Sequence, residues 1–204
     1  MILTFLSAQT AEILEITATV TFVAYLVLQI THSRWMWYLY IPSCVCAALN
    51  FFNSATWAFA ALNIYYVVMG VVGIRNWRRD AARARAQQDE TAGGIILNRL
   101  PRKILAVSAV MVAAGIPALY FLLSALSDPN PLLDAVTTAL SIVGTWWLTR
   151  SYIQQWWIWI VADVFAIWMN VNLGNHWFVI QFALCILSSF VGLWNWGRNG
   201  RYAS

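Results

Sequence analysis

The chain has 204 residues, of which 61% are hydrophobic and only 10% are charged, and its formal net charge at pH 7 is +4. A soluble domain carries about 45–50% apolar and about 25% charged residues, so this composition excludes an ordinary soluble fold and indicates an integral membrane protein. Eight of the twelve cationic residues lie in one stretch, between residues 75 and 103, which favours a topology signal over a nucleic-acid-binding surface.

Seven apolar segments, each about as long as a bilayer core requires, follow one another along the chain. They are Ile13–Ile30, Trp35–Phe52, Trp57–Ile74, Ile104–Leu126, Leu132–Leu148, Trp156–Leu173 and Trp177–Trp194. We predict that each segment is a transmembrane helix, so the expected fold is an all-α integral membrane protein. The connections between them are short except for the polar stretch from Arg75 to Lys103.

The distribution of positive charge predicts the orientation of these helices. If the long polar stretch is cytoplasmic, then Arg34, Arg150, Arg198 and Arg201 also fall on the cytoplasmic side. All twelve cationic residues then lie inside, as the positive-inside rule expects. The N-terminus is therefore expected to lie outside and the C-terminus in the cytoplasm.

The first three and the last three segments repeat each other. An offset of 122 positions aligns Leu26 with Leu148 and Trp37 with Trp159, and a three-residue deletion then aligns the segments 73–77 and 192–196. This pattern predicts a 3+1+3 plan in which the repeats are parallel and related by an axis along the membrane normal, an architecture of transporters.

The expected parts are a first three-helix repeat (1–77), a cytoplasmic basic linker (78–103), a linker transmembrane helix (104–126), a second three-helix repeat (127–197) and a cytoplasmic tail (198–204). The basic linker is interpreted either as a helix on anionic headgroups or as a topology signal alone.

An acidic side chain, Asp163, lies in the middle of the sixth apolar segment. A carboxylate at this depth is costly, so it tends to face a bundle interior, a water-filled cavity or a ligand. At about 100° per residue, Trp156, Trp159 and Asn170 share one helical stripe with Asp163, and this stripe indicates a site for a polar, aromatic ligand. Two alternatives stay open: the tryptophans as an interfacial belt, and Asp163 as an acceptor that locks helices together.

Four residues on other segments complete the candidate binding site. Asn63 and Tyr66 share a stripe of the third segment, Gln181 lies on the seventh, and the repeat pairs Trp37 with Trp159. Gln181 is an attractive candidate because a primary amide both donates and accepts hydrogen bonds. Close packing between helices is the alternative explanation for the polar and small residues of the third segment.

Enzyme chemistry is not expected. His32 and His176 fall in loops at opposite faces, so they cannot share a metal centre or a nucleophilic triad. A single acid at membrane depth also argues against a membrane hydrolase or transferase. We expect no catalytic residues, no metal and no cofactor.

The segment from Trp147 to Val164 reads WLTRSYIQQWWIWIVADV. It resembles the signature of the PnuC family of vitamin transporters, which is approximately W-L-x-x-R-x-Y-x-E-N-W-x-x-W-x-x-x-D. Trp156, Trp159 and Asp163 match its two tryptophans and its acid. The resemblance extends over nearly the whole chain. It implies a fold like that of the SWEET sugar transporters, a homotrimeric assembly and a location in the bacterial inner membrane.

The resemblance also implies a function: uptake of nicotinamide riboside by facilitated diffusion, with trapping by cytoplasmic phosphorylation. The expected partners are a vitamin substrate and the lipid bilayer, and no nucleic acid.

Members of the family also carry thiamine, riboflavin or deoxynucleosides. Gln154 and Gln155 stand where the family has Glu-Asn, and Asn63 stands where Gln is common. These departures keep thiamine as the alternative substrate, since an aromatic cation suits tryptophan faces equally well. A carrier for another solute, such as a sugar, and a structural subunit are the remaining hypotheses.

Overall fold

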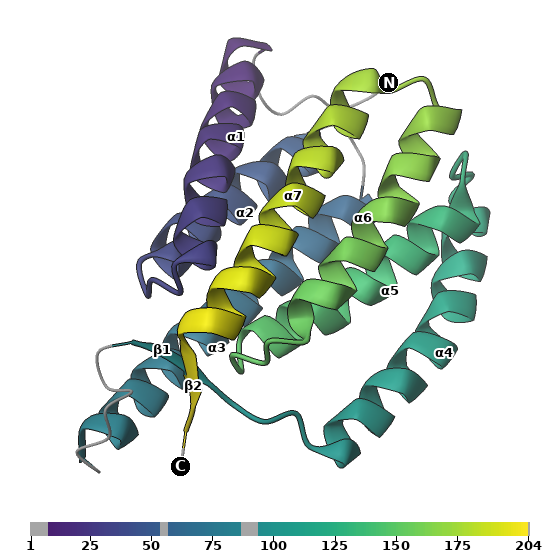
Figure 1. The fold of residues 1–204 in the computed structure, drawn as a ribbon. Coiled ribbons are helices and arrows are strands. Elements are labelled where there is room, and N and C mark those ends of the chain that lie inside the picture. Colours follow the sequence, from purple (N-terminus) through teal and green to yellow (C-terminus); the bar gives the residue numbers. More distant parts are fainter. Residues whose placement is uncertain (1–7, 54–56, 87–93, 204) are drawn as a thin grey trace.

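The computed structural model describes residues 8–53, 57–86 and 94–203 of the chain. Within these ranges it contains seven helices and two short strands (Figure 1). They are α1 (Ala8–Ile30), α2 (Met36–Asn53), α3 (Trp57–Ala86), β1 (Ile95–Leu97), α4 (Arg102–Ala125), α5 (Pro131–Leu148), α6 (Gln155–Asn172), α7 (His176–Asn199) and β2 (Gly200–Tyr202). The prediction of an all-α fold with seven helices is confirmed in the described part of the chain.

Helix α3 is longer than predicted. It continues without interruption from the expected end at Ile74 to Ala86, and its last turn carries Arg83 and Arg85. Its 30 residues span about 45 Å, which exceeds the roughly 30 Å of a hydrocarbon core. The first part of the predicted basic linker is therefore the end of α3 and not a separate helix on the membrane surface.

The helices form two groups of three, as Figure 1 shows. Helix α2 packs against both α1 and α3, and α6 packs in the same way against both α5 and α7. The groups meet where α1 contacts α7 and where α3 contacts α5.

Helix α4 stands at the edge of the bundle and packs chiefly against α5 (Figure 1). Most of its apolar surface is uncovered; Val110 and Phe121, for example, are 67% and 70% exposed. By length and composition, α4 and the segment Phe178–Asn199 are each able to cross a membrane. Apolar side chains exposed on this scale indicate a lipid environment.

A pair of indole hydrogen bonds joins the groups at the end of the bundle that carries the arginines. Trp77 Nε1 of α3 donates to the carbonyl oxygen of Leu148 on α5, at 3.2 Å. Trp196 Nε1 of α7 donates to the carbonyl oxygen of Gln29 on α1, at 3.1 Å. The two donors differ by 119 positions, and so do the two acceptors. Each group therefore donates one indole hydrogen bond to the other group and accepts the equivalent bond from it.

Asparagine side chains beside these tryptophans repeat the relationship. Asn76 Nδ2 donates to Thr149 O at 3.2 Å, and Asn195 Nδ2 donates to Ile30 O at 2.7 Å. The residue numbers again differ by 119. Two reciprocal pairs with one offset are what an approximate twofold relationship between the groups predicts at this end.

The predicted offset of 122 is wrong in this region. It pairs Trp37 with Trp159, whereas the offset of 119 pairs Trp37 with Trp156. The packing supports the second pairing, because Trp37 lies against Gly73 of α3 while Trp156 lies against Gly192 of α7. Three residues are close to one helical turn, so a shift of three leaves each tryptophan on nearly the same helix face and the sequence does not distinguish the two registers.

The polar linker and the C-terminal segment meet in a short parallel ladder that the sequence did not predict. Strand β1 pairs with β2, with Ile96 opposite Arg201 at the centre, and Ala203 N donates to Leu97 O at 2.9 Å. All three β1 side chains are buried. The tail predicted over residues 198–204 is therefore helical to Asn199 and then pairs with the polar linker.

Candidate binding site

Asp163 lies at the middle of α6 and is 7% exposed. It is within electrostatic range of Tyr25 on α1, Tyr66 on α3 and Cys185 on α7. Its neighbours therefore come from both helix groups. Among the described residues none donates a hydrogen bond to this carboxylate, so the alternative of a helix lock lacks the partner that it requires. A carboxylate in this setting is available to a ligand.

Trp159 lies one turn before Asp163 and packs against α5. A Cβ atom added at Gly144 would lie 3.2 Å from the Trp159 indole, so a glycine is what allows this close approach. The indole Nε1 is buried and has no acceptor among the described residues. Buried polar atoms are nearly always satisfied in folded proteins, so this N–H is a candidate for contact with a ligand or water.

Three tyrosine rings extend the site across the first group. The Tyr25 and Tyr40 ring centroids are 4.8 Å apart, and those of Tyr40 and Tyr66 are 6.0 Å apart. Tyr65 OH donates to Ile142 O at 2.8 Å and so ties α3 to α5 beside this set. Tyr25 and Tyr40 were not predicted; the available signal was a phenol hydroxyl well inside an apolar segment.

Two of the predicted tryptophans belong to an indole cluster that borders the tyrosine set, where the ring centroids of Trp37 and Tyr40 are 5.8 Å apart. Trp37 and Trp156 are 0% and 1% exposed, and they pack against Trp77 and Trp196, with ring centroids 5.4 and 5.3 Å apart, respectively. This indole cluster belongs to the packed end of the bundle that carries the arginines. Because Trp156 is buried there, it does not form an interfacial aromatic belt.

The three predicted amide side chains, those of Asn170, Gln181 and Asn63, also lie in different parts of the bundle. The Asn170 side chain donates to Ala166 O at 2.8 Å and accepts from Asn175 Nδ2 at 3.3 Å, so its amide is used at the end of α6. Gln181 is exposed on α7 and does not join the buried set. Asn63 is half-buried one turn before Tyr66. The structure thus places Tyr66 within electrostatic range of Asp163 and Trp159 one turn before it on α6, while the role of each predicted residue in ligand binding stays a prediction.

The site has an acid but no fixed cation. Every lysine and arginine of the chain lies at position 34, 75–103, 150, 198 or 201, outside the apolar spans that surround Asp163. A ligand bound beside Asp163 therefore meets a carboxylate, phenols and indoles. This chemistry suits a cationic or neutral aromatic molecule and opposes an anionic one.

A bundle of helices with extensively exposed apolar side chains and a buried acid between two three-helix groups is typical of a helical membrane transporter. A family model described as nicotinamide mononucleotide transporter matches residues 12–198. The chain belongs to this family of transporters, and the predicted resemblance to PnuC is confirmed.

Two individual proteins support the family assignment. A curated nicotinamide riboside transporter PnuC of Neisseria mucosa is 28% identical over 142 residues, which cover 66% of this chain and 52% of the relative. The match thus spans about half the length of that relative. The crystal structure of the vitamin B3 transporter PnuC is similar with a TM-score of 0.68 and 22% identity, over 91% of this chain and 80% of that chain. This likeness establishes the fold.

Proposed function

We propose that this protein takes up nicotinamide riboside across the bacterial inner membrane by facilitated diffusion, with cytoplasmic phosphorylation trapping the vitamin. The observation that carries the proposal is the buried carboxylate of Asp163, which no described residue hydrogen-bonds and which lies near Tyr25 and Tyr66 of the first group and Cys185 of the second. Family membership supports the activity, and the curated relative is named for this substrate.

The chemistry of the ligand fits the site. Nicotinamide riboside joins a flat, cationic aromatic ring to a neutral sugar. The ring can stack on Trp159 or Tyr66, at about 0.5–2 kcal/mol for each cation–π contact. The Asp163 carboxylate can balance the ring charge or accept from a ribose hydroxyl, and the Trp159 N–H can donate to an oxygen of the ligand. Several weak contacts suit a carrier, because a carrier must release what it binds.

The absence of a cation in the apolar spans favours the riboside over the mononucleotide. A phosphate monoester carries about −1.5 to −2 charges at pH 7, and Asp163 would repel it in a medium of low dielectric constant. The other aromatic cation of the family, thiamine, satisfies the same contacts. It remains the alternative substrate, and direct binding distinguishes the two.

We also propose the topology and the assembly. The two groups form 3+1+3 parallel repeats of the SWEET type, with α4 as the linker helix, the N-terminus periplasmic and the C-terminus cytoplasmic. The reciprocal hydrogen bonds of Trp77 and Trp196 support the repeat, and the grouping of arginines at one end supports the orientation. The resemblance to PnuC is the support for a homotrimer.

Calorimetric titration of the purified protein with a ligand panel tests the proposal. The panel comprises nicotinamide riboside, nicotinamide mononucleotide, thiamine, riboflavin, a deoxynucleoside and glucose. We expect micromolar binding of nicotinamide riboside and no binding of the mononucleotide. Tight binding of thiamine alone would reassign the substrate, and a lack of binding to every aromatic compound would contradict the assigned site.

A further inference from the structure

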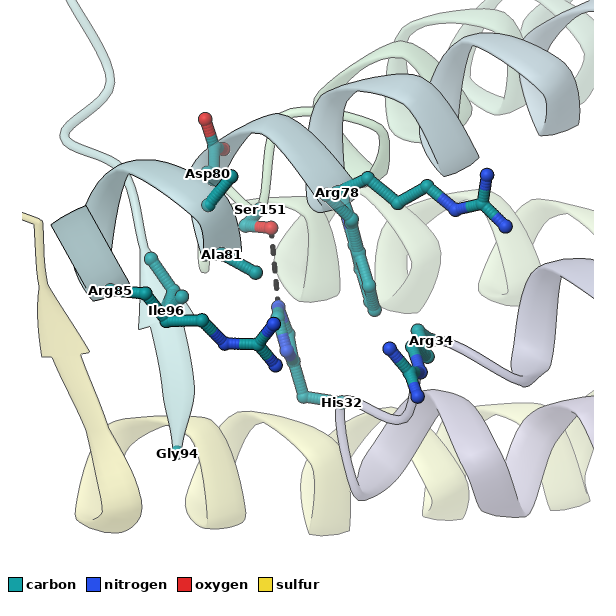
Figure 2. Close-up of a pocket in the computed structure, with 11 residues that line it drawn as sticks. His32, Arg34, Arg78, Asp80, Ala81, Arg85, Gly94, Ile96 and Ser151 are labelled. Carbon is teal, nitrogen blue, oxygen red and sulfur yellow. Dashed lines mark hydrogen bonds between the residues drawn. The ribbon is translucent and has the colours of Figure 1, made fainter. Parts of the chain in front are cut away.

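A cavity opens at the end of the bundle that carries the arginines, and Asp163 is not part of its lining. Its volume is about 360 Å³. It lies between the end of α3, the loop that joins α1 to α2, and the segment around β1. Its polar and aromatic lining consists of His32, Arg34, Trp77, Arg78, Asp80, Arg85 and Ser151 (Figure 2). The transport site uses none of these residues.

The floor of the cavity joins the two helix groups. His32 Nε2 and Ser151 Oγ are 3.2 Å apart, and each residue lies in the loop between the first two helices of its group. The His32 ring stacks on Trp77 with centroids 3.9 Å apart and meets the edge of Trp196 at 4.8 Å. Both His32 and Ser151 have a φ of 52°, and they also obey the 119-residue offset. These contacts hold two hydrogen-bonding side chains in fixed positions.

Arginine side chains flank this floor. Figure 2 shows the guanidinium of Arg85 reaching toward His32 from α3, and that of Arg34 on the other side of the histidine. Neither arginine is paired with a carboxylate in the described part of the chain, and the Arg34 guanidinium carbon lies 5.8 Å from the centroid of the Trp35 ring. Arg78 also lines the cavity, and it donates to the hydroxyl of Tyr38.

One carboxylate opposes these charges. Asp80 lines the cavity and accepts a hydrogen bond from Asn98 Nδ2 at 2.9 Å. The lining therefore carries more positive than negative charge. Guanidinium groups match the geometry of phosphate oxygens and form strong charge-assisted hydrogen bonds with them. A singly charged anion leaves part of this excess unbalanced, whereas a dianion balances it.

We propose that this cavity binds a phosphate monoester, held by Arg34 and Arg85 above the His32–Ser151 pair. A soluble sugar phosphate or nucleotide and the headgroup of phosphatidic acid share this chemistry. A bound monoester would contact α3 and the loops of both groups, so it would stabilise the packing of this end of the bundle. The site does not depend on which vitamin the protein transports.

Calorimetric titration with ribose 5-phosphate tests the proposal on the full-length protein in phosphatidylcholine nanodiscs, with ribose as the uncharged comparison. We expect saturable binding of ribose 5-phosphate alone. Arg34→Gln and Arg85→Gln should each weaken it about tenfold or more, since each removes a charged hydrogen-bond donor. Asp80→Asn should tighten it, because the variant removes the repelling carboxylate.

Arg83→Gln is the matched control. Arg83 is exposed in the same last turn of α3 and does not line the cavity, so its loss should leave the affinity unchanged. The folding of each variant is checked by its melting temperature without ligand. No saturable binding by the native protein, or equal losses in Arg83→Gln and Arg85→Gln, would overturn the proposal, because equal losses indicate diffuse surface charge.

Lipid composition distinguishes the two sources of the monoester. If phosphatidic acid is the ligand, its addition to the nanodiscs raises the melting temperature of the native protein, but not of Arg85→Gln, and blocks ribose 5-phosphate. If only soluble esters enter, phosphatidic acid has no effect while ribose 5-phosphate still binds. An equal rise with phosphatidylglycerol, a phosphodiester, would contradict recognition of a monoester.

Discussion

Trp159 and Asp163 contribute different interactions to the proposed transport site. Trp159→Ala removes a stacking face and a buried N–H, so vitamin binding should weaken about tenfold or more, equivalent to about 1.4 kcal/mol. Trp157→Ala is the control, because Trp157 is adjacent on α6 and 54% exposed. Calorimetry of both variants measures the effect. Normal affinity in Trp159→Ala would remove this residue from the site.

Asp163→Asn separates charge from shape. The amide keeps the size of the side chain but loses the negative charge, so a cationic vitamin should bind less tightly while a neutral nucleoside analogue is affected less. Uptake into liposomes, together with calorimetry, provides the comparison. If both ligands behave as they do with the native protein, Asp163 is a structural residue and the counter-charge assignment is wrong.

His32 makes stability depend on pH. Burial lowers the pKa of its imidazole from 6.5 to about 3, so the ring stays neutral in the folded state. The ring lies between the side chains of Arg34 and Arg85. Above pH 6.5 the ring is neutral in both states. As the pH falls below 6.5, the unfolded chain gains a proton that the folded chain does not, so stability falls by up to about 2 kcal/mol at pH 5. Melting curves at pH 7.5 and pH 5 should show this loss, and His32→Gln should reduce it. An unchanged difference in the variant would assign the effect to other groups.

At the scale of the elements, glycines determine how closely the helices approach. A Cβ atom at Gly192 would lie closer than 3.0 Å to the Trp156 ring, so Gly192→Ala should push α7 from α6 and cost about 1–3 kcal/mol. Gly197→Ala lies on the same helix, where the nearest atom, on Ile153, is 3.8 Å away. The control should be neutral or slightly stabilising. Thermal unfolding in detergent compares the two, and equal stabilities would show that α7 adjusts freely.

At the scale of the whole molecule, the reciprocal indole bonds predict equal effects in the two groups. Trp77→Phe and Trp196→Phe each remove one N–H donor that reaches across to the other group. Each should therefore cost about 1 kcal/mol, with similar falls in melting temperature. A loss in one variant without a comparable loss in the other would contradict the approximate twofold relationship at this end.

The sequence by itself determined the class of protein, the seven helices, the family and the prominence of Asp163. Each of these follows from local properties: apolar length, the cost of a buried charge, and a motif of contiguous residues. Helix ends were predicted to within a few residues except in α3, because the apolar signal stops at Ile74 while the charged residues beyond it continue the helix.

Only the tertiary structure decided which side chains share a site. Trp156 and Trp159 lie on one helix stripe, yet the first packs against Gly192 and the second against Gly144, because different neighbouring helices cover successive turns of α6. The exposure of Gln181, the approach of Tyr25 and Tyr66 to Asp163, and the arginine-lined cavity depend likewise on contacts between distant segments. Helical periodicity specifies the face on which a residue lies, and packing between helices decides what that face meets.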